Sequence, residues 1–298
     1  MTSTQIKKPT SEALSAEPSF IFKYIWPIHR HETSRFLLTT LLMFCILFIQ
    51  NLIRAEKDSI VTTMIGAEML SFLKFWGVMP AAILMAVVYV KLISVFKPQN
   101  VFYILMSSFI LFFGVFAFFI FPNHEALHLQ KDASDALILS FPHFKWVILI
   151  GSKWGFSLFY IMAELWPNTV FALLFWQFVN SVTTVEESKR FYTLFGLLGQ
   201  TGLYLSGQFL ENLINLSNIV KNSLGLESES LTVISVQLVL SVVLVLGVIG
   251  IFTFWLLNKK ITNADEIEFK AKKQKMGLKE SFKMVAESRY IRLIAILL

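Results

Sequence analysis

An acidic side chain, Glu164, lies deep in the apolar region from Trp146 to Val182, where charges are rare. Lys153 lies eleven residues earlier, about three helical turns, so a continuous helix would place both side chains near one face. An ionised residue at the centre of a membrane costs about 2.5–3.5 kcal/mol on insertion scales, and such residues usually face a polar cavity. We therefore expect Lys153 and Glu164 to share a cavity. A salt bridge between two helices is the structural alternative for Glu164.

Four more charged residues lie near the first two apolar stretches. Arg54, Lys57 and Asp58 follow the first stretch, and Lys74 opens the second. Ammonium and guanidinium groups can replace the hydration that phosphate oxygens lose on binding, so these cations predict a site for a polyanion such as a nucleotide di- or triphosphate. Two alternatives stay open. Arg54, Lys57 and Asp58 could form an interfacial loop with its own ion pair, and Lys74 could extend to the membrane surface.

A second pattern with possible chemistry is His124-Glu125-Ala126-Leu127-His128. It matches the H-E-x-x-H spacing, in which two histidines one helical turn apart bind zinc and the glutamate activates water. A catalytic zinc also needs a third protein ligand and a shielded cleft, whereas this motif lies in a polar segment that we expect to be an outer loop. A membrane zinc protease is therefore the alternative from another functional class. The nearest possible third ligands are Asp132, Asp135 and His143.

The elements that carry these residues are membrane-spanning helices. Hydrophobic residues make up 55% of the 298-residue chain and its mean hydropathy is +0.65, both high for a soluble domain. A bilayer crossing needs about 20 mostly apolar residues in a helix. We expect an all-α polytopic membrane protein with six crossings, the fourth a long helix that bends at Pro167. The crossings are Phe36–Leu52, Phe75–Val90, Val101–Phe121, Trp146–Val182, Phe191–Leu210 and Leu231–Leu257.

The distribution of basic residues predicts the orientation of these six crossings. With both ends of the chain on the cytoplasmic side, that side collects 19 of the 26 lysine and arginine residues. The net charge of +6 is then a consequence of topology and requires no nucleic-acid partner. His29, His31 and Glu32 are interpreted as a solvated flank of the first helix. The single cysteine, Cys45, excludes an intramolecular disulfide.

The sequence divides into four predicted regions. Residues 1–35 form a cytoplasmic tail, 36–257 a six-helix bundle, 258–289 a charged cytoplasmic linker, and 290–298 the start of a seventh crossing. Six crossings followed by a basic linker are typical of the first half of a major-facilitator-like carrier, in which two halves enclose a site near the midplane. We therefore expect a longer parent protein whose C-terminal half is a partner of this chain.

Short motifs along nearly the whole chain support a family resemblance, although each is weak alone. The sequence resembles the bacterial and plastid nucleotide transporter family, the ATP/ADP translocases of obligate intracellular bacteria. The motifs are Trp26-Pro27-Ile28, Arg54 with Lys57-Asp58, Phe72-Leu73-Lys74, Pro80-Ala81-Ala82, Phe159-Tyr160, Ala163-Glu164-Leu165-Trp166, Phe175-Trp176, Lys189-Arg190-Phe191-Tyr192 and Phe195-Gly196.

This resemblance implies a twelve-helix secondary transporter without a cofactor, in the inner membrane of an intracellular bacterium. It implies exchange of ATP for ADP by alternating access, or proton-coupled import of other nucleotides or NAD. It also assigns roles in transport to Lys74 and Glu164. The sequence departs from the family pattern at Ala55, Pro167 and Gly199-Gln200.

Overall fold

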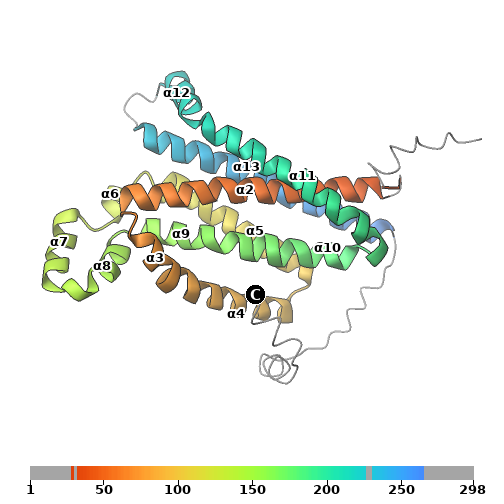
Figure 1. Ribbon diagram of the computed structural model, residues 1–298, viewed down its shortest axis with the longest axis horizontal. Coiled ribbons are helices and arrows are strands. Elements are labelled where there is room, and N and C mark those ends of the chain that lie inside the picture. Colours follow the sequence, from red (N-terminus) through yellow and green to blue (C-terminus); the bar gives the residue numbers. More distant parts are fainter. Residues whose placement is uncertain (1–27, 30–31, 226–229, 265–298) are drawn as a thin grey trace, which may run out of the picture.

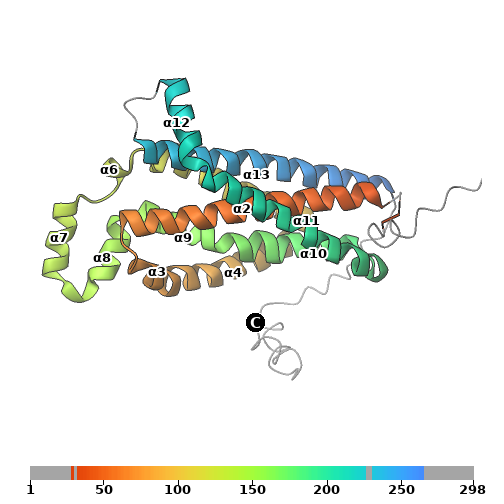
Figure 2. The same ribbon diagram turned by 45° about the horizontal axis from the view of Figure 1, so that its top comes forward.

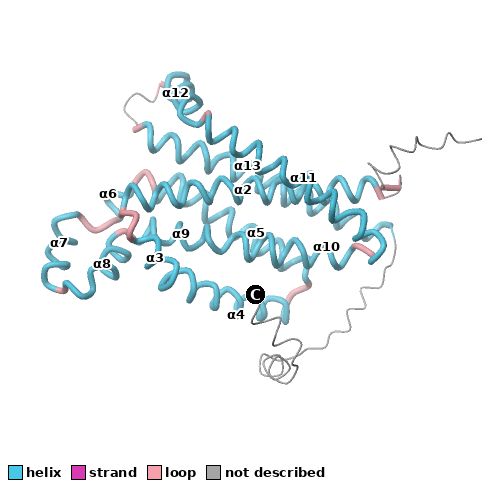
Figure 3. The backbone as a smooth tube through the Cα atoms, in the orientation of Figure 1, coloured by secondary structure: helices cyan, strands magenta, loops and turns pink. Residues whose placement is uncertain are grey.

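The computed structural model describes residues 28–29, 32–225 and 230–264, and every regular element in these ranges is a helix (Figure 1). Short turns connect the helices (Figure 3). The longer ones are α2 (Thr33–Met64), α4 (Met79–Val95), α5 (Pro98–Val115), α9 (Trp154–Trp166), α11 (Val185–Glu211) and α13 (Leu231–Ala264).

The shorter elements extend the long helices or connect them. Three are π-helical: η1 (Leu73–Val78), η2 (Phe116–Ile120) and η4 (Pro167–Phe175). A π-helix has wider turns than an α-helix and is often found at functional sites. The others are α3 (Met69–Phe72), α6 (His124–Leu127), α7 (Lys131–Ser140), η3 (Pro142–Phe144), α8 (Lys145–Ser152), α10 (Trp176–Val182) and α12 (Leu213–Leu224).

Five helical stretches in the described ranges are long and apolar enough to cross a membrane: Thr33–Met64, Met69–Val95, Pro98–Ile120, Trp154–Val182 and Leu231–Lys260. Each contains or overlaps one predicted crossing, which confirms a polytopic all-α membrane protein. The remaining predicted crossing, Phe191–Leu210, lies in α11. This helix has 27 residues, but Gln200 and Gln208 lower its hydropathy. α11 runs beside α2 in both views of the ribbon (Figures 1 and 2), and its crossing of the membrane remains a prediction.

The fourth predicted crossing begins later than the sequence indicated. The expected continuous helix from Trp146 is wrong, because α8 ends at Ser152 and Lys153 has non-helical backbone angles, φ −114° and ψ 40°. The helix that spans begins at Trp154. At Pro167 it continues as the nine-residue π-helix η4, since proline lacks the N–H of a regular helical hydrogen bond and disturbs the α-helical pattern.

The first helix continues beyond its predicted end. α2 runs to Met64 without a break, so Arg54, Lys57 and Asp58 lie inside a helix of 32 residues. The alternative that these three residues form an interfacial loop is therefore wrong. The chain turns only after Met64, at Gly66, whose φ of +131° favours glycine.

Contacts at one end of the bundle show how the helices are oriented. Lys260 near the end of α13 donates a hydrogen bond to Ser34 at the start of α2, and Glu187 at the start of α11 is paired with Arg35. The start of α2 and the end of α13 therefore lie at the same end of the bundle, as the charge distribution predicts. α13 passes the expected boundary at Leu257 and ends at Ala264. Most of the predicted tail and linker, and the predicted seventh helix, lie outside the described residues.

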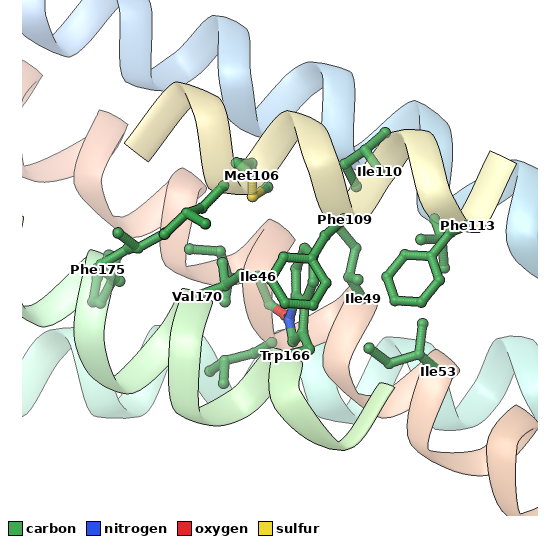
Figure 4. Packing of buried hydrophobic residues seen from close by; sticks show 14 of the residues in the cluster. Ile46, Ile49, Ile53, Met106, Phe109, Ile110, Phe113, Trp166, Val170 and Phe175 are labelled. Atoms are coloured by element: carbon green, nitrogen blue, oxygen red, sulfur yellow. The ribbon is translucent and has the colours of Figure 1, made fainter. Parts of the chain in front are cut away.

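An aromatic core fixes the helices relative to one another. Trp166 of α9 is fully buried, its ring lies 5.6 Å from that of Phe109 of α5, and its indole N–H donates to the carbonyl oxygen of Ile46 of α2 at 3.3 Å. Phe116 and Phe159 stack with ring centroids 4.2 Å apart. Figure 4 shows Ile46, Phe109 and Trp166 filling the space between α2, α5 and the helix formed by α9 and η4. This packing holds α9 firmly against α2.

Candidate functional site

The centre of the candidate site is an ion pair between α2 and α9. Lys57 Nζ lies 3.0 Å from Glu164 Oε1, although Glu164 follows Lys57 by 107 positions in the sequence. Only 5% of the Lys57 side chain is exposed, compared with 25% of the Glu164 side chain. Both residues belong to helical stretches that are apolar enough to cross a membrane. The structural alternative for Glu164, a salt bridge between helices, is thus present, and its partner is one of the predicted site residues.

Tyr160 supports both members of this ion pair. It lies one turn before Glu164 on α9 and is fully buried. Its hydroxyl donates a hydrogen bond to Glu164 Oε1 at 3.3 Å, and Lys57 Nζ lies 4.5 Å from the centre of its ring. A cation over an aromatic face is stabilised, most strongly where water is excluded. Tyr160 therefore holds the lysine and the glutamate together.

A second carboxylate competes for the same lysine. Asp58 Oδ1 lies 2.6 Å from Lys57 Nζ, and 46% of the Asp58 side chain is exposed. One buried ammonium group is therefore shared by two partly exposed carboxylates. Arg54 lies one turn before Asp58 and is exposed, and within the described ranges the structure records no hydrogen bond or ion pair for it. Lys57, Asp58 and Glu164 form a group that Arg54 extends along α2.

Lys74 lies close to this group but does not join it. It is exposed and belongs to η1, and the residue before it, Leu73, packs in one cluster with Tyr160. Gly77, one turn after Lys74, lies so close to α9 that a methyl group there would come within 2.9 Å of Ile161. η1 is therefore fixed against α9 beside the ion pair. In the part of the chain that the structure describes, no contact joins Lys74 to Glu164.

Lys153 is separated from Glu164 by the break before α9. It lies in the turn between α8 and α9, so the argument that placed both residues on one continuous helix does not hold. Its charge acts instead on His128, which lies in the loop opposite this turn. The structure records no contact between Lys153 and Glu164 among the residues it describes.

The H-E-x-x-H segment is part of a folded connection rather than a polar loop. α6 ends at Leu127 and His128 caps it, with its N–H bonded to the carbonyl oxygen of His124 and its ring 6.4 Å from the ring of His124. His128 Nε2 accepts a hydrogen bond from the N–H of Gly155 at 3.1 Å. Burial, together with smaller contributions from the charges of Lys153 and His124, lowers the pKa of His128 to about 4. In the described ranges no three His, Cys, Asp or Glu side chains are grouped so that they could hold a metal ion.

The interpretation of a solvated flank before the first helix holds for His29, whose side chain is 63% exposed, but not for Glu32, and His31 lies outside the described residues. Glu32 is 5% exposed and accepts two hydrogen bonds from the Arg190 guanidinium, at 3.0 and 3.1 Å. Burial alone would raise the pKa of Glu32, but the hydrogen bonds from Arg190 and His29 outweigh burial and hold that pKa below its ordinary value. With the pair Arg35–Glu187, this contact joins the start of α2 to the start of α11. We call Glu32, Arg35, Glu187 and Arg190 the terminal brace.

The sequence reasoning missed Glu56. This residue lies in α2 beside Lys57, but its side chain points into the bundle and is only 7% exposed. A signal was present, because Glu56 lies between Arg54 and Lys57, two residues that were already assigned to the candidate site. What the sequence could not indicate is that α2 continues through this region and buries it.

Comparison with known proteins agrees with this architecture. The sequence profile of the TLC ATP/ADP transporter family matches residues 13–298. The ADP,ATP carrier protein 4 of Rickettsia felis is 60% identical over 99% of this chain, and that of Rickettsia bellii is 62% identical over 92%. The ADP,ATP carrier protein 3 of Rickettsia bellii is 42% identical over 92%.

These alignments cover 58%, 53% and 57% of the three relatives, so the chain spans little more than half their length. No solved structure matches the chain. The matching family profile covers nearly all residues, and the apolar helices fit a membrane protein of this family. The chain belongs to the TLC ATP/ADP transporter family and is a multi-pass membrane protein.

Proposed function

We propose that this chain forms the N-terminal half of a secondary transporter that exchanges ATP for ADP across the inner membrane of a bacterium. The relatives named ADP,ATP carrier proteins support the cargo. The observation that carries the proposal is the buried ion pair between Lys57 and Glu164, in helices that can span a membrane. Charges at such depth usually mark a substrate or ion pathway.

The shared lysine provides a mechanism for responding to a polyanion. In the conformation described here, Lys57 is held by both Glu164 and Asp58. A phosphate group entering from the exposed side would compete for the ammonium group and could replace one carboxylate without leaving the lysine unpaired. Breaking a buried pair without replacement costs about 3–5 kcal/mol, so the exchange of partners avoids most of that cost.

Two exposed cations could bring the phosphates to this point. Arg54 lies one turn before Asp58 on α2, and Lys74 lies on η1 beside α9. An arginine can bind two phosphate oxygens at once, whereas a lysine acts as a compact charge. We propose that Arg54 and Lys74 bind the phosphates first. Lys57 and Glu164 then separate when a phosphate binds, and this changes the contact between α2 and α9.

The exposed faces of the bundle are consistent with a second half. Only 6% of the apolar window in Met69–Val95 is buried, and this stretch is long and apolar enough to cross a membrane. We propose that the C-terminal half of the carrier covers part of this face and lipid covers the rest. Rocking of the halves around the site would then expose it to each side in turn.

The test is uptake of labelled nucleotide by the full-length carrier in proteoliposomes. Lys57→Ala, Lys74→Ala and Glu164→Ala should each abolish uptake of labelled ATP in exchange for internal ADP, with unchanged amounts of protein in the membrane. Lys145→Ala is the matched control, because Lys145 is an exposed lysine in α8 and, within the described ranges, makes no hydrogen bond or ion pair with Lys57 or Glu164. Control-like rates in all three variants would overturn the proposed site. A panel of unlabelled nucleotides and NAD in competition would identify the cargo.

A further inference from the structure

Glu56 is a buried carboxyl that the proposed exchange mechanism does not use. It lies in a helical stretch apolar enough to span the membrane, and its residue exposure is 7%. Among the residues that the structure describes, it has no hydrogen-bond or ion-pair partner. Its neighbour Lys57 is directed to α9, where it meets Glu164. The two adjacent charges of α2 therefore lie in different surroundings.

Helical spacing places Glu56 on the side of α2 that faces α13. Cys45 lies beside Gly250 of α13, and Glu56 follows Cys45 by eleven residues, about three turns. From Leu231 to Leu257, α13 carries no charged or titratable side chain. Glu56 thus points toward an apolar helix.

The other elements packed against α2 do not provide a cation for Glu56. α3 and η4 contain no titratable residue. α9 contributes Tyr160 and Glu164, and both are bound to Lys57 or to each other. In the half of α11 level with this part of α2, Tyr204 and Glu211 are exposed. Neither could neutralise a carboxylate.

A carboxylate without a partner in an apolar interior is strongly disfavoured, and the group takes up a proton instead. We propose that Glu56 is a proton-binding site of this carrier, neutral in the conformation described here. A proton from water forms the O–H bond at a carboxylate oxygen, and the same bond breaks when the site opens to water on the other side. No oxidation or reduction is involved.

The position of Glu56 links this proton to the ion pair. Glu56 and Lys57 are consecutive residues of one rigid helix, so a movement of α2 that separates Lys57 from Glu164 also shifts Glu56 relative to α13. We infer that the proton is taken up and released as the carrier changes conformation. This coupling rests on the proposed function, whereas the proton site itself does not.

The proton site can be tested without transport, by infrared spectroscopy of the protein in lipid membranes at neutral pH. The wild type should show a protonated-carboxyl band that disappears in Glu56→Gln. The band should persist in Glu68→Gln, in which an exposed carboxyl of the turn after α2 is changed. The glutamine has the shape of the neutral acid and should fold normally. If the spectrum of Glu56→Gln kept the same protonated-carboxyl band as the wild type, the proposal would be overturned.

The coupling is tested in proteoliposomes of the full-length carrier that contain a pH-sensitive dye. Nucleotide entry should acidify the interior in the wild type and in Glu68→Gln, and this acidification should be lost in Glu56→Gln. Nucleotide movement without proton movement in the wild type would overturn the coupling. If the wild type moves no nucleotide, the proposed transport function fails, and the infrared result still decides whether Glu56 binds a proton.

Discussion

The terminal brace and the group around Lys57 are both ion-pair clusters on α2, but their charges are arranged differently. In the brace, Arg190 pairs with Glu32 and Arg35 with Glu187, so each cation has its own carboxylate. In the other group a single ammonium serves two carboxylates, and both of these are partly exposed. In the brace every charge is already paired, so an added anion would find no cation to bind. In the Lys57 group two carboxylates share one ammonium, so an added anion can replace one of them.

This difference assigns the two clusters different tasks. The brace joins the start of α2 to the start of α11, so we expect it to hold these two helix ends together. The Lys57 group lies in the second half of α2 and joins α2 to α9, just before the wider turns of η4. Substitutions in the brace should therefore affect stability, whereas substitutions in the Lys57 group should affect transport as well.

The largest effect is expected from Lys57→Ala. It leaves Asp58 and Glu164 without their shared cation, so uptake should fall on the order of 100-fold, because losing a buried charge partner costs about 3 kcal/mol. Glu164→Ala should also stop uptake but should lower the unfolding temperature less, since Lys57 keeps Asp58. Thermal unfolding of the purified carrier and labelled-nucleotide uptake measure the two effects. Equal loss of stability in both variants would contradict the idea of a shared cation.

Arg190→Ala should separate stability from transport. It leaves the buried carboxylate of Glu32 without its two strongest hydrogen bonds, so we expect a loss of about 2 kcal/mol in the free energy of unfolding. Uptake per folded molecule should change little. Lys189→Ala is the control, because Lys189 is the exposed neighbour of Arg190. If Arg190→Ala had normal stability but no uptake, the brace would take part in transport rather than in stability.

The brace should also weaken in acid. The pKa of Glu32 is lowered in the folded state, because its hydrogen bonds with Arg190 and His29 outweigh burial. Its contribution to stability is therefore complete above the unfolded value of about 4.5 and is lost as the pH falls through the lower folded value. Thermal unfolding of the wild type and Glu32→Gln at several pH values measures this. The two curves should converge in acid, and a constant difference would exclude the brace as the cause.

The sequence predicted the helices better than it predicted their partners. Uninterrupted apolar stretches indicated five of the crossings, since a membrane leaves little choice of structure. The sequence also identified Lys57 and Glu164 as candidate site residues. The sequence could not indicate that they pair with each other, because the segment between them contains other lysines, and only the packing of α9 on α2 selects Lys57.

The errors have local causes. Lys153 was assigned to the long helix because its neighbours are apolar, but the chain breaks there and Leu129 N–H bonds with the carbonyl of Ser152 across the connection. Glu56 was overlooked because burial of one face of a helix depends on the neighbouring helix, and α13 lies far away in the sequence. Hydropathy depends only on the length and composition of a segment. The break at Lys153 and the burial of Glu56 depend on contacts between segments that are distant in the sequence.

The smallest expected effects concern the contact between α2 and α11 that continues the brace into the membrane. A methyl group at Gly202 would lie 3.0 Å from the carbonyl oxygen of Phe44, which is backbone and cannot move easily. At Gly199 the nearest atom, at 2.9 Å, is the flexible end of the Met43 side chain. Gly202→Ala should therefore lower the unfolding temperature more than Gly199→Ala, and both substitutions should leave the Lys57 group intact.

Gly207→Ala is the control for these two substitutions, because a methyl group there meets nothing within 4 Å. It should be neutral or slightly stabilising, since alanine favours a helix by about 0.5–1 kcal/mol over glycine. Thermal unfolding of the three variants gives the order directly. If Gly202→Ala were as stable as Gly207→Ala, α2 and α11 would be further apart than described. The brace would then hold only the ends of the two helices and not their shared length.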